Sequence, residues 1–257
     1  MKPIGIIGGV GPLADLDLIQ KIRTQTQAST DQEHIPVILH SFPHQIPDRS
    51  AFLSGQSPDN PTGPLLNVLE SVARAGAAVV GMPCNTAHTP AIFEPLQARA
   101  ATLGIRLLNM VDETVQFVQN NYPDIQRPGL FGTNGTYQSG IYETAFSKLK
   151  IDLTLPVPTT QTEVMHPAIY DPTWGIKAAC HPVSDQARRL LSRGMMHLKE
   201  QNADAVLLAC TELPPAVDTH LLCGLKAIDP TFALARALIQ YASGASSVPL
   251  ANDLRGT

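Results

Sequence analysis

The sequence is poor in charged residues and shows no basic cluster. Asp, Glu, Lys and Arg make up 16% of the 257 residues, and the formal net charge is −4. A chain without clustered Lys and Arg lacks the electrostatic footprint of a nucleic-acid-binding protein. A protein of net negative charge also does not attract anions through its overall field, so an anionic substrate would require cations placed locally.

The sequence also lacks closely spaced cysteines and long apolar runs. The absence of a C-x-x-C pair argues against a zinc knuckle or a thioredoxin-type site, and a few well-separated thiols are typical of a reducing compartment. No stretch approaches the roughly 20 apolar residues of a membrane span. Glycines and aspartates interrupt the apolar N-terminus, which makes it a poor signal peptide. We therefore expect a cytoplasmic protein without a membrane partner. The four cysteines are Cys84, Cys180, Cys210 and Cys223.

Short apolar runs alternate with amphipathic segments along the chain. This alternation predicts mostly parallel sheets flanked by helices. The segment 43–64 is rich in Pro, Ser, Gly and Asp, and it predicts a long loop, of a kind that is usually functional or disordered. The strands are expected over residues 4–7, 35–40, 77–82, 129–131 and 205–209, with helices over 64–75 and 230–241.

The two halves of the chain repeat one pattern. A glycine-rich turn follows the strand 4–7, and a second one follows the strand 129–131. Cys84 follows the first turn at nearly the same separation as Cys210 follows the second, and each cysteine closes a later strand. The repeat predicts an α/β fold of two similar Rossmann-like lobes, with the active site in the cleft between them. The first lobe would comprise residues 1–112 and 224–257, and the second residues 113–223.

Two thiols at strand ends can move a proton across a carbon atom. A thiolate is a competent base and a neutral thiol is a usable acid, and a free cysteine titrates near pH 8.5, close to working conditions. If Cys84 and Cys210 serve opposite faces of one carbon, one removes a proton while the other delivers one. Such a pair inverts the centre without a cofactor. The context of Cys180 and Cys223 indicates ordinary buried cysteines.

Several motifs together resemble the aspartate/glutamate racemase family, and within it the aspartate racemase branch. The Cys-Asn-Thr-Ala-His and Cys-Thr-Glu segments are the most specific of them. The matching motifs, which occur in the expected order over most of the chain, are Gly5-Ile6-Ile7-Gly8-Gly9-Val10-Gly11-Pro12, Ile46-Pro47-Asp48-Arg49, Gly81-Met82-Pro83-Cys84-Asn85-Thr86-Ala87-His88, Gly132-Thr133-Asn134-Gly135-Thr136 and Ala209-Cys210-Thr211-Glu212-Leu213.

The resemblance implies an isomerase that racemises L- and D-aspartate with two cysteines, without pyridoxal phosphate or metal, and that forms a homodimer. It assigns Cys84 and Cys210 as the catalytic pair. It also implies that Arg49 and Lys177 hold the side-chain carboxylate of the amino-acid substrate. The substrate-contacting positions are expected to be Val10, Arg49, Asn85, Thr86, Thr133, Thr136, Lys177, Thr211 and Glu212.

The chain departs from the family pattern at two positions. Family members commonly have Met at the position of Val10, which we expect to change only local packing, and Thr at the position of Asp15. Because a carboxylate near a carboxylate-binding site is unfavourable, we expect Asp15 to point away. His88 and Glu212 are further candidates, for orienting the first thiol and for adjusting the second thiol or steering the substrate ammonium.

Other interpretations of the same residues stay open. The first glycine turn fits a dinucleotide-binding G-x-G-x-x-A pattern, but we favour a tight strand–helix turn. His34, His40 and His44 are unevenly spaced, and we interpret them as surface residues and not as metal ligands. The alternative functions are a related two-cysteine enzyme acting on glutamate, maleate, a hydantoin or another carboxylate, and a non-catalytic small-anion-binding protein on the same scaffold.

Overall fold

The computed structural model describes residues 1–179 and 182–244, so Cys180 and residues 245–257 lie outside the described part. The chain forms two compact units. Unit 1 comprises Met1–Glu113 and the described chain from Thr231 onward, and unit 2 comprises Thr114–Pro230. Each unit is a parallel α/β structure, which is the fold class expected from the sequence.

Unit 1 contains a four-stranded parallel sheet with the strand order β2-β1-β3-β4. The expected strands at 4–7, 35–40 and 77–82 are present, the last two shorter than expected, while the two-residue strand β4 was not expected. The strands are β1 (Ile4–Ile7), β2 (Val37–His40), β3 (Val79–Gly81) and β4 (Arg106–Leu107).

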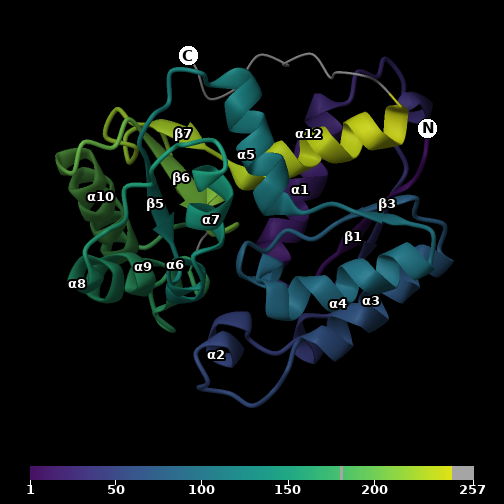
Figure 1. Ribbon diagram of the computed structural model, residues 1–257, viewed down its shortest axis with the longest axis horizontal. Helices are drawn as coiled ribbons and strands as arrows, with labels where there is room; N and C mark the ends of the chain where they lie inside the picture. The colour runs from purple at the N-terminus through teal and green to yellow at the C-terminus, as the bar shows by residue number, and fades with distance from the viewer. Residues whose placement is uncertain (180–181, 245–257) are drawn as a thin grey trace. The chain divides into compact units, whose positions relative to one another are not determined.

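Helices cover both faces of this sheet because β1 is apolar on both sides. Ile4 and Ile6 pack with residues of α1 and α12, including Leu238. Ile7 packs on the opposite face with residues of α3 and α4, including Leu69; these two helices run side by side (Figure 1). A parallel strand buried on both faces reads as a continuous apolar run, which is why its position was predictable. The helices are α1 (Pro12–Gln25), α3 (Thr62–Arg74), α4 (Pro90–Thr102) and α12 (Pro230–Ser243).

The expectation of a long loop over 43–64 was wrong in part. This segment contains the short helix α2 (Arg49–Leu53) and a 3-10 turn, η2 (Pro43–Gln45). Helix α2 begins after Asp48 because the Asp48 carboxylate accepts a 2.8 Å hydrogen bond from the backbone N–H of Ala51. Further 3-10 turns are η1 (Asp31–Glu33) and η3 (Thr86–His88).

Unit 2 contains a three-stranded parallel sheet with the order β5-β6-β7. Strand β7 lies in the segment that the sequence analysis gave to the first lobe. It belongs to unit 2 because it pairs with β6. The boundary between the units near residue 113 falls within helix α5 (Met110–Asn121). The strands are β5 (Pro128–Gly132), β6 (Ala205–Ala209) and β7 (Lys226–Ile228).

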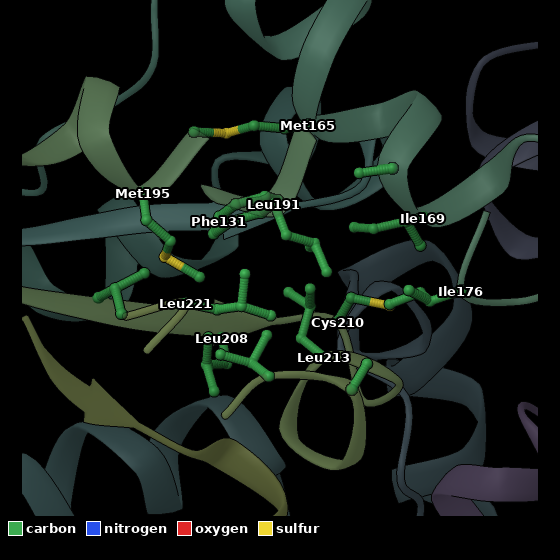
Figure 2. Close-up of a cluster of buried hydrophobic side chains, with 14 of the residues drawn as sticks. Phe131, Met165, Ile169, Ile176, Leu191, Met195, Leu208, Cys210, Leu213 and Leu221 are labelled. Atoms are coloured by element: carbon green, nitrogen blue, oxygen red, sulfur yellow. The ribbon is translucent and has the colours of Figure 1, made fainter. Parts of the chain in front are cut away.

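The core of unit 2 lies between the sheet and the helices that follow β5. Phe131 of β5 and Leu208 of β6 pack against Leu191 and Met195 of α10, and Cys210 joins the same cluster (Figure 2). In the part of the chain that the structure describes, no helix has the length and apolar character needed to cross a bilayer. The remaining helices are α6 (Asn134–Ser139), α7 (Ile141–Ser147), α8 (Pro158–Thr160), η4 (Gln161–Met165, a π-helix), α9 (His166–Tyr170), α10 (Asp185–Glu200) and α11 (Leu213–Ala216).

Candidate active site

In both units the strand that carries the glycine turn pairs directly with the strand that leads to the cysteine. Strand β1 pairs with β3 in unit 1, and β5 pairs with β6 in unit 2. Because the carboxyl ends of neighbouring parallel strands meet at one edge of a sheet, each cysteine lies at the same edge as a glycine turn. This edge is where ligands bind in open α/β sheets. The repeat detected in the sequence is therefore a repeat in three dimensions.

Cys84 lies in a tight turn just beyond β3. Its backbone N–H donates to the carbonyl oxygen of Met82 (2.9 Å), and its own carbonyl oxygen accepts from the N–H of Ala87 (3.2 Å). The Cys84 residue is 7% exposed, and Asn85 and Thr86 beside it are also buried. The Cys84 loop, defined here as residues 83–88, thus holds the first thiol in a compact, folded turn.

His88 anchors the Cys84 loop from within. Its Nδ1 donates a 2.8 Å hydrogen bond to the carbonyl oxygen of Cys84, and its ring lies 4.8 Å from the ring of Phe93. Burial lowers the pKa of His88 from 6.5 to about 4, although nearby backbone carbonyls oppose this shift. The imidazole is therefore neutral at physiological pH, and it orients the backbone of the cysteine without adding charge.

The glycine turn of unit 1 requires its glycines. Gly9 has a positive φ of 79°, and a Cβ at this position would come within 2.8 Å of the backbone nitrogen of Phe42. The Asp15 carboxylate accepts hydrogen bonds from the N–H of Gly9 (2.8 Å) and from the hydroxyl of Ser41 (2.6 Å). The Asp15 carboxylate thus faces the turn, which offers it donors and joins it to the end of β2, while its orientation away from a substrate carboxylate stays a prediction.

Arg49 is buried and is attached to the same glycine turn. As the first residue of α2, it donates through Nη2 to the carbonyl oxygen of Val10 and through Nη1 to that of Pro47 (3.2 Å). A planar guanidinium fixed by two backbone carbonyls is oriented in a way that suits recognition of a carboxylate. Val10 itself contributes its carbonyl oxygen, while its side chain is part of the core.

Cys210 directly follows β6 and is paired with a carboxylate. Its thiol donates a 3.2 Å hydrogen bond to Oε2 of Glu212. Cys210 is 6% exposed. Burial, and then the adjacent Glu212 carboxylate, raise the pKa of the Cys210 thiol well above its usual value, against the opposing effect of Lys177. The thiol is therefore protonated at rest.

Lys177 comes from a distant part of unit 2 and completes this group. Its Nζ lies 3.0 Å from Oε1 of Glu212 and 5.2 Å from the ring centre of Tyr170. Burial alone would lower the pKa of Lys177, but the attraction of Glu212 outweighs it and the pKa is raised. The ammonium is therefore charged, and its side chain keeps 24% exposure.

The three threonines expected at the site in unit 2 are all buried. Thr133 caps helix α6: its Oγ1 accepts from the N–H of Thr136 at 3.3 Å and lies 3.3 Å from the Thr136 hydroxyl. Gly132, which precedes this cap, pairs with Ala209, and a Cβ on Gly132 would come within 3.0 Å of the Ala209 carbonyl oxygen. The turn therefore packs directly against the strand end that carries Cys210 and Thr211.

Gln161 and His166, which no sequence motif marks, support the second glycine turn. The amide nitrogen of Gln161 donates to the carbonyl oxygen of Gly132 (3.1 Å) and to Oδ1 of Asn134 (3.0 Å). Nδ1 of His166 accepts from the backbone N–H of Asn134 (3.3 Å). Both residues come from the η4–α9 segment, which contains no recognisable motif, so only the folded arrangement connects them with the turn.

His34, His40 and His44 do not take part in a metal-binding arrangement in the structure. Within the described residues, no three His, Cys, Asp or Glu side chains gather closely enough to hold a metal ion. His40 and His44 instead lie with tilted rings against Phe42, with ring centres 4.5 and 5.8 Å from that of Phe42.

Two parallel α/β units, each with a thiol at a strand end beside a glycine turn, define a class of two-cysteine α/β proteins. The chain belongs to the Asp/Glu/hydantoin racemase family, whose model matches residues 7–238. This membership supports the assignment of the chain as an amino-acid racemase that acts on small substrates.

Similar proteins include racemases of different specificity. The aspartate racemase of Picrophilus torridus is 30% identical, with a TM-score of 0.76 and coverage of 95% of both chains. The broad-specificity amino-acid racemase RacX of Bacillus subtilis (strain 168) is 24% identical over 243 residues, which is 92% of this chain and 96% of that protein. A glutamate racemase from Francisella tularensis, solved with D-glutamate, shares the fold with a TM-score of 0.67 at 13% identity, covering 98% of this chain and 84% of its own.

Proposed function

We propose that the protein interconverts L- and D-aspartate without a cofactor, using Cys84 and Cys210 as a two-base pair. The observation that carries this proposal is the equivalent placement of the two thiols, each beyond the strand next to a glycine turn. Membership of the racemase family and the similarity to an aspartate racemase support it. The proposal requires both units to contribute to one site, as the sequence analysis expected.

In the proposed reaction, a Cys84 thiolate takes the α-proton of one enantiomer. The electron pair of the broken C–H bond is held briefly by the α-carbon and its carboxylate. The protonated Cys210 then delivers its proton to the opposite face, so that Cys84 ends as the thiol and Cys210 as the thiolate. The hydrogen bond from Cys210 to Glu212 supports this starting state, because it presents the second cysteine as an acid.

The proposed specificity for aspartate depends on one cation from each unit. Arg49 and Lys177 would hold the side-chain carboxylate, which a protein of net negative charge does not otherwise attract. Arg49 is fixed by backbone carbonyls and Lys177 by Glu212. Asn85, Thr86, Thr133, Thr136 and Thr211 would contact the α-amino and α-carboxylate groups.

A second candidate is racemisation of a wider set of amino acids. The similarity to RacX, a broad-specificity racemase, favours this possibility. It differs from the first proposal in one measurable respect: neutral amino acids would be turned over as efficiently as aspartate. A panel of L-amino acids that includes aspartate, glutamate and alanine separates the two.

The decisive experiment follows deuterium from solvent into the substrate. The purified protein is incubated with L-aspartate in D2O after dialysis against a chelator and treatment with hydroxylamine, which removes pyridoxal phosphate. We expect D-aspartate to appear with deuterium at the α-carbon. Absence of exchange for every amino acid of the panel would contradict the assignment as a racemase, and activity restored only by pyridoxal phosphate would contradict the two-thiol mechanism.

Light scattering of the same sample tests the proposed homodimer.

A further inference from the structure

We propose that the side-chain oxygen Oε1 of Gln161 accepts a hydrogen bond from the α-ammonium group of the substrate. This inference rests on the proposed function, since it names a contact for the amino-acid substrate of that site. It concerns a residue outside every sequence motif of the chain. Three observations carry it: the fixed orientation of the Gln161 amide, its place at the sheet edge and its unpaired acceptor.

The orientation of the amide is determined by its partners. The nitrogen Nε2 donates both of its hydrogens, one to the carbonyl oxygen of Gly132 and one to Oδ1 of Asn134. A backbone carbonyl can only accept, so the nitrogen must face Gly132 and Oε1 must face elsewhere. The amide is therefore locked with its acceptor pointing away from the turn that holds it.

The acceptor itself has no protein partner. Gln161 is 1% exposed, and Oε1 has no hydrogen bond to any described residue. A buried acceptor without a partner costs free energy, so native proteins keep such atoms rarely and mostly where function requires them. The residue also begins the π-helix η4, a type of local irregularity that occurs often at functional sites.

The position of the amide places this acceptor near Cys210. Oε1 shares a carbon atom with Nε2, which is 3.1 Å from the Gly132 carbonyl oxygen. Gly132 pairs with Ala209, the residue before Cys210, and neighbouring strands lie roughly 4.8 Å apart. The unpaired acceptor therefore lies at the edge of the sheet where the second thiol emerges.

Among the polar groups of an amino acid, the ammonium suits this acceptor. Both carboxylates of aspartate carry only acceptors, which Oε1 would repel, whereas the ammonium has three N–H donors. A neutral amide oxygen can bind an ammonium without competing with Cys210 for the α-proton. It thereby complements Arg49 and Lys177, whose cations suit the carboxylate.

The test compares aspartate with succinate, which has the same two carboxylates and no amino group. Dissociation constants are measured by calorimetry for the wild type and for Gln161→Met, which keeps the approximate size but removes the amide. Loss of a hydrogen bond to a charged group predicts aspartate binding weaker by about tenfold or more. Succinate binding should change by less than about twofold. Equal weakening for both ligands, or no weakening for either, would overturn the proposal.

Asn134→Ala is the matched control, because it removes one partner of Nε2 and leaves Oε1 in place. Because the Gly132 carbonyl still orients the amide, we expect a weakening of aspartate binding smaller than in Gln161→Met, and a loss as large as in Gln161→Met would contradict the inference. A crystal structure of the wild type with aspartate tests the contact directly and does not depend on a variant that folds. The α-nitrogen should lie within about 3.2 Å of Oε1; an α-nitrogen bound elsewhere overturns the inference.

These outcomes are separable from those of the proposed function. A wild-type protein that binds aspartate through Gln161 but exchanges no α-proton contradicts racemisation and keeps the ammonium contact. A protein that racemises aspartate with unchanged binding in Gln161→Met keeps racemisation and contradicts the contact.

Discussion

The loop of Cys84 in unit 1 and the loop of Cys210 in unit 2 have the same place in their sheets but are held by different chemistry. His88, which is neutral, donates to the carbonyl oxygen of Cys84. In unit 2 the thiol itself donates to the Glu212 carboxylate, which is paired with Lys177. In unit 1 a neutral imidazole thus holds the backbone of the cysteine. In unit 2 a carboxylate that belongs to an ion pair contacts the sulfur atom of the cysteine.

The difference shows that a repeated scaffold can hold its two cysteines by different interactions. The Glu212 carboxylate favours the protonated thiol of Cys210. A pair in which one member is protonated at rest has a defined starting state, which a two-base racemisation requires.

The largest expected effect is the loss of either thiol. Cys84→Ala and Cys210→Ala should each lower racemisation of aspartate by about 10²- to 10⁴-fold, because each removes one of two proton-transfer groups. Chiral chromatography of the product measures this loss. Cys223→Ser, in a partly exposed residue away from both strand ends, is the control and should stay near wild type. Near-normal racemisation by either alanine variant would contradict the two-base mechanism.

The next effect concerns the two cations. Arg49→Ala should lower kcat/KM for aspartate by roughly 10- to 150-fold, the cost of one charged hydrogen bond, with a smaller loss for alanine. Lys177→Ala should show a similar loss for aspartate. It should also slow alanine turnover, because Lys177 holds Glu212 as well. If Arg49→Ala lowers kcat/KM equally for aspartate, glutamate and alanine, this residue does not bind the side-chain carboxylate.

A third effect tests whether His88 is neutral. Its pKa in the folded protein, about 4, lies below the usual 6.5, so the unfolded chain binds the extra proton first as the pH falls. The stabilisation is complete above about pH 6.5 and is lost as the pH falls towards 4. Between pH 7 and pH 5 the free energy of unfolding should drop by about 2 kcal/mol more in the wild type than in His88→Gln. Urea titrations at the two pH values measure this difference, and parallel pH dependence of both proteins would contradict a neutral, buried His88.

The smallest effect is on the reactivity of Cys210. Burial, and then the Glu212 carboxylate, raise the pKa of this thiol; Glu212→Gln removes the second cause, so more thiolate forms at a given pH. Alkylation of Cys210 by iodoacetamide at pH 8 should accelerate several-fold, while alkylation of Cys84 serves as the internal reference. Lys177→Met should change the rate in the opposite direction, because Lys177 lowers the same pKa. Mass spectrometry resolves the two peptides, and a slower reaction in Glu212→Gln would refute the assigned role.

The sequence predicted those parts of the fold that depend on local apolar runs. Strands β1 and β6 begin and end where expected, since both are continuous runs of buried residues. Helix α2 was missed because the cap provided by Asp48 was not recognised within a segment rich in loop-forming residues. Strand β7 was given to the wrong lobe, because pairing between strands is decided by tertiary structure and not by sequence proximity.

The candidate site was predictable to the extent that its residues stand in motifs. The expected interaction of Glu212 with the second thiol is present, as is the orientation of the Cys84 loop by His88. The pairing of Lys177 with Glu212 was not foreseen, because 35 residues separate them. Gln161 has no sequence signal at all, and its significance depends on an acceptor that only the folded chain leaves unpaired.

Unit 1 is interrupted along the chain, and this affects the order in which the protein can mature on the ribosome. One face of the unit 1 sheet is covered by α12, where the side chain of Leu238 reaches the backbone of Gly81 so closely that a Cβ there would lie 2.8 Å away. Unit 2 is continuous and is synthesised in full before this helix begins. The apolar face of the sheet that carries Cys84 therefore cannot be covered by α12 until the whole of unit 2 has been synthesised.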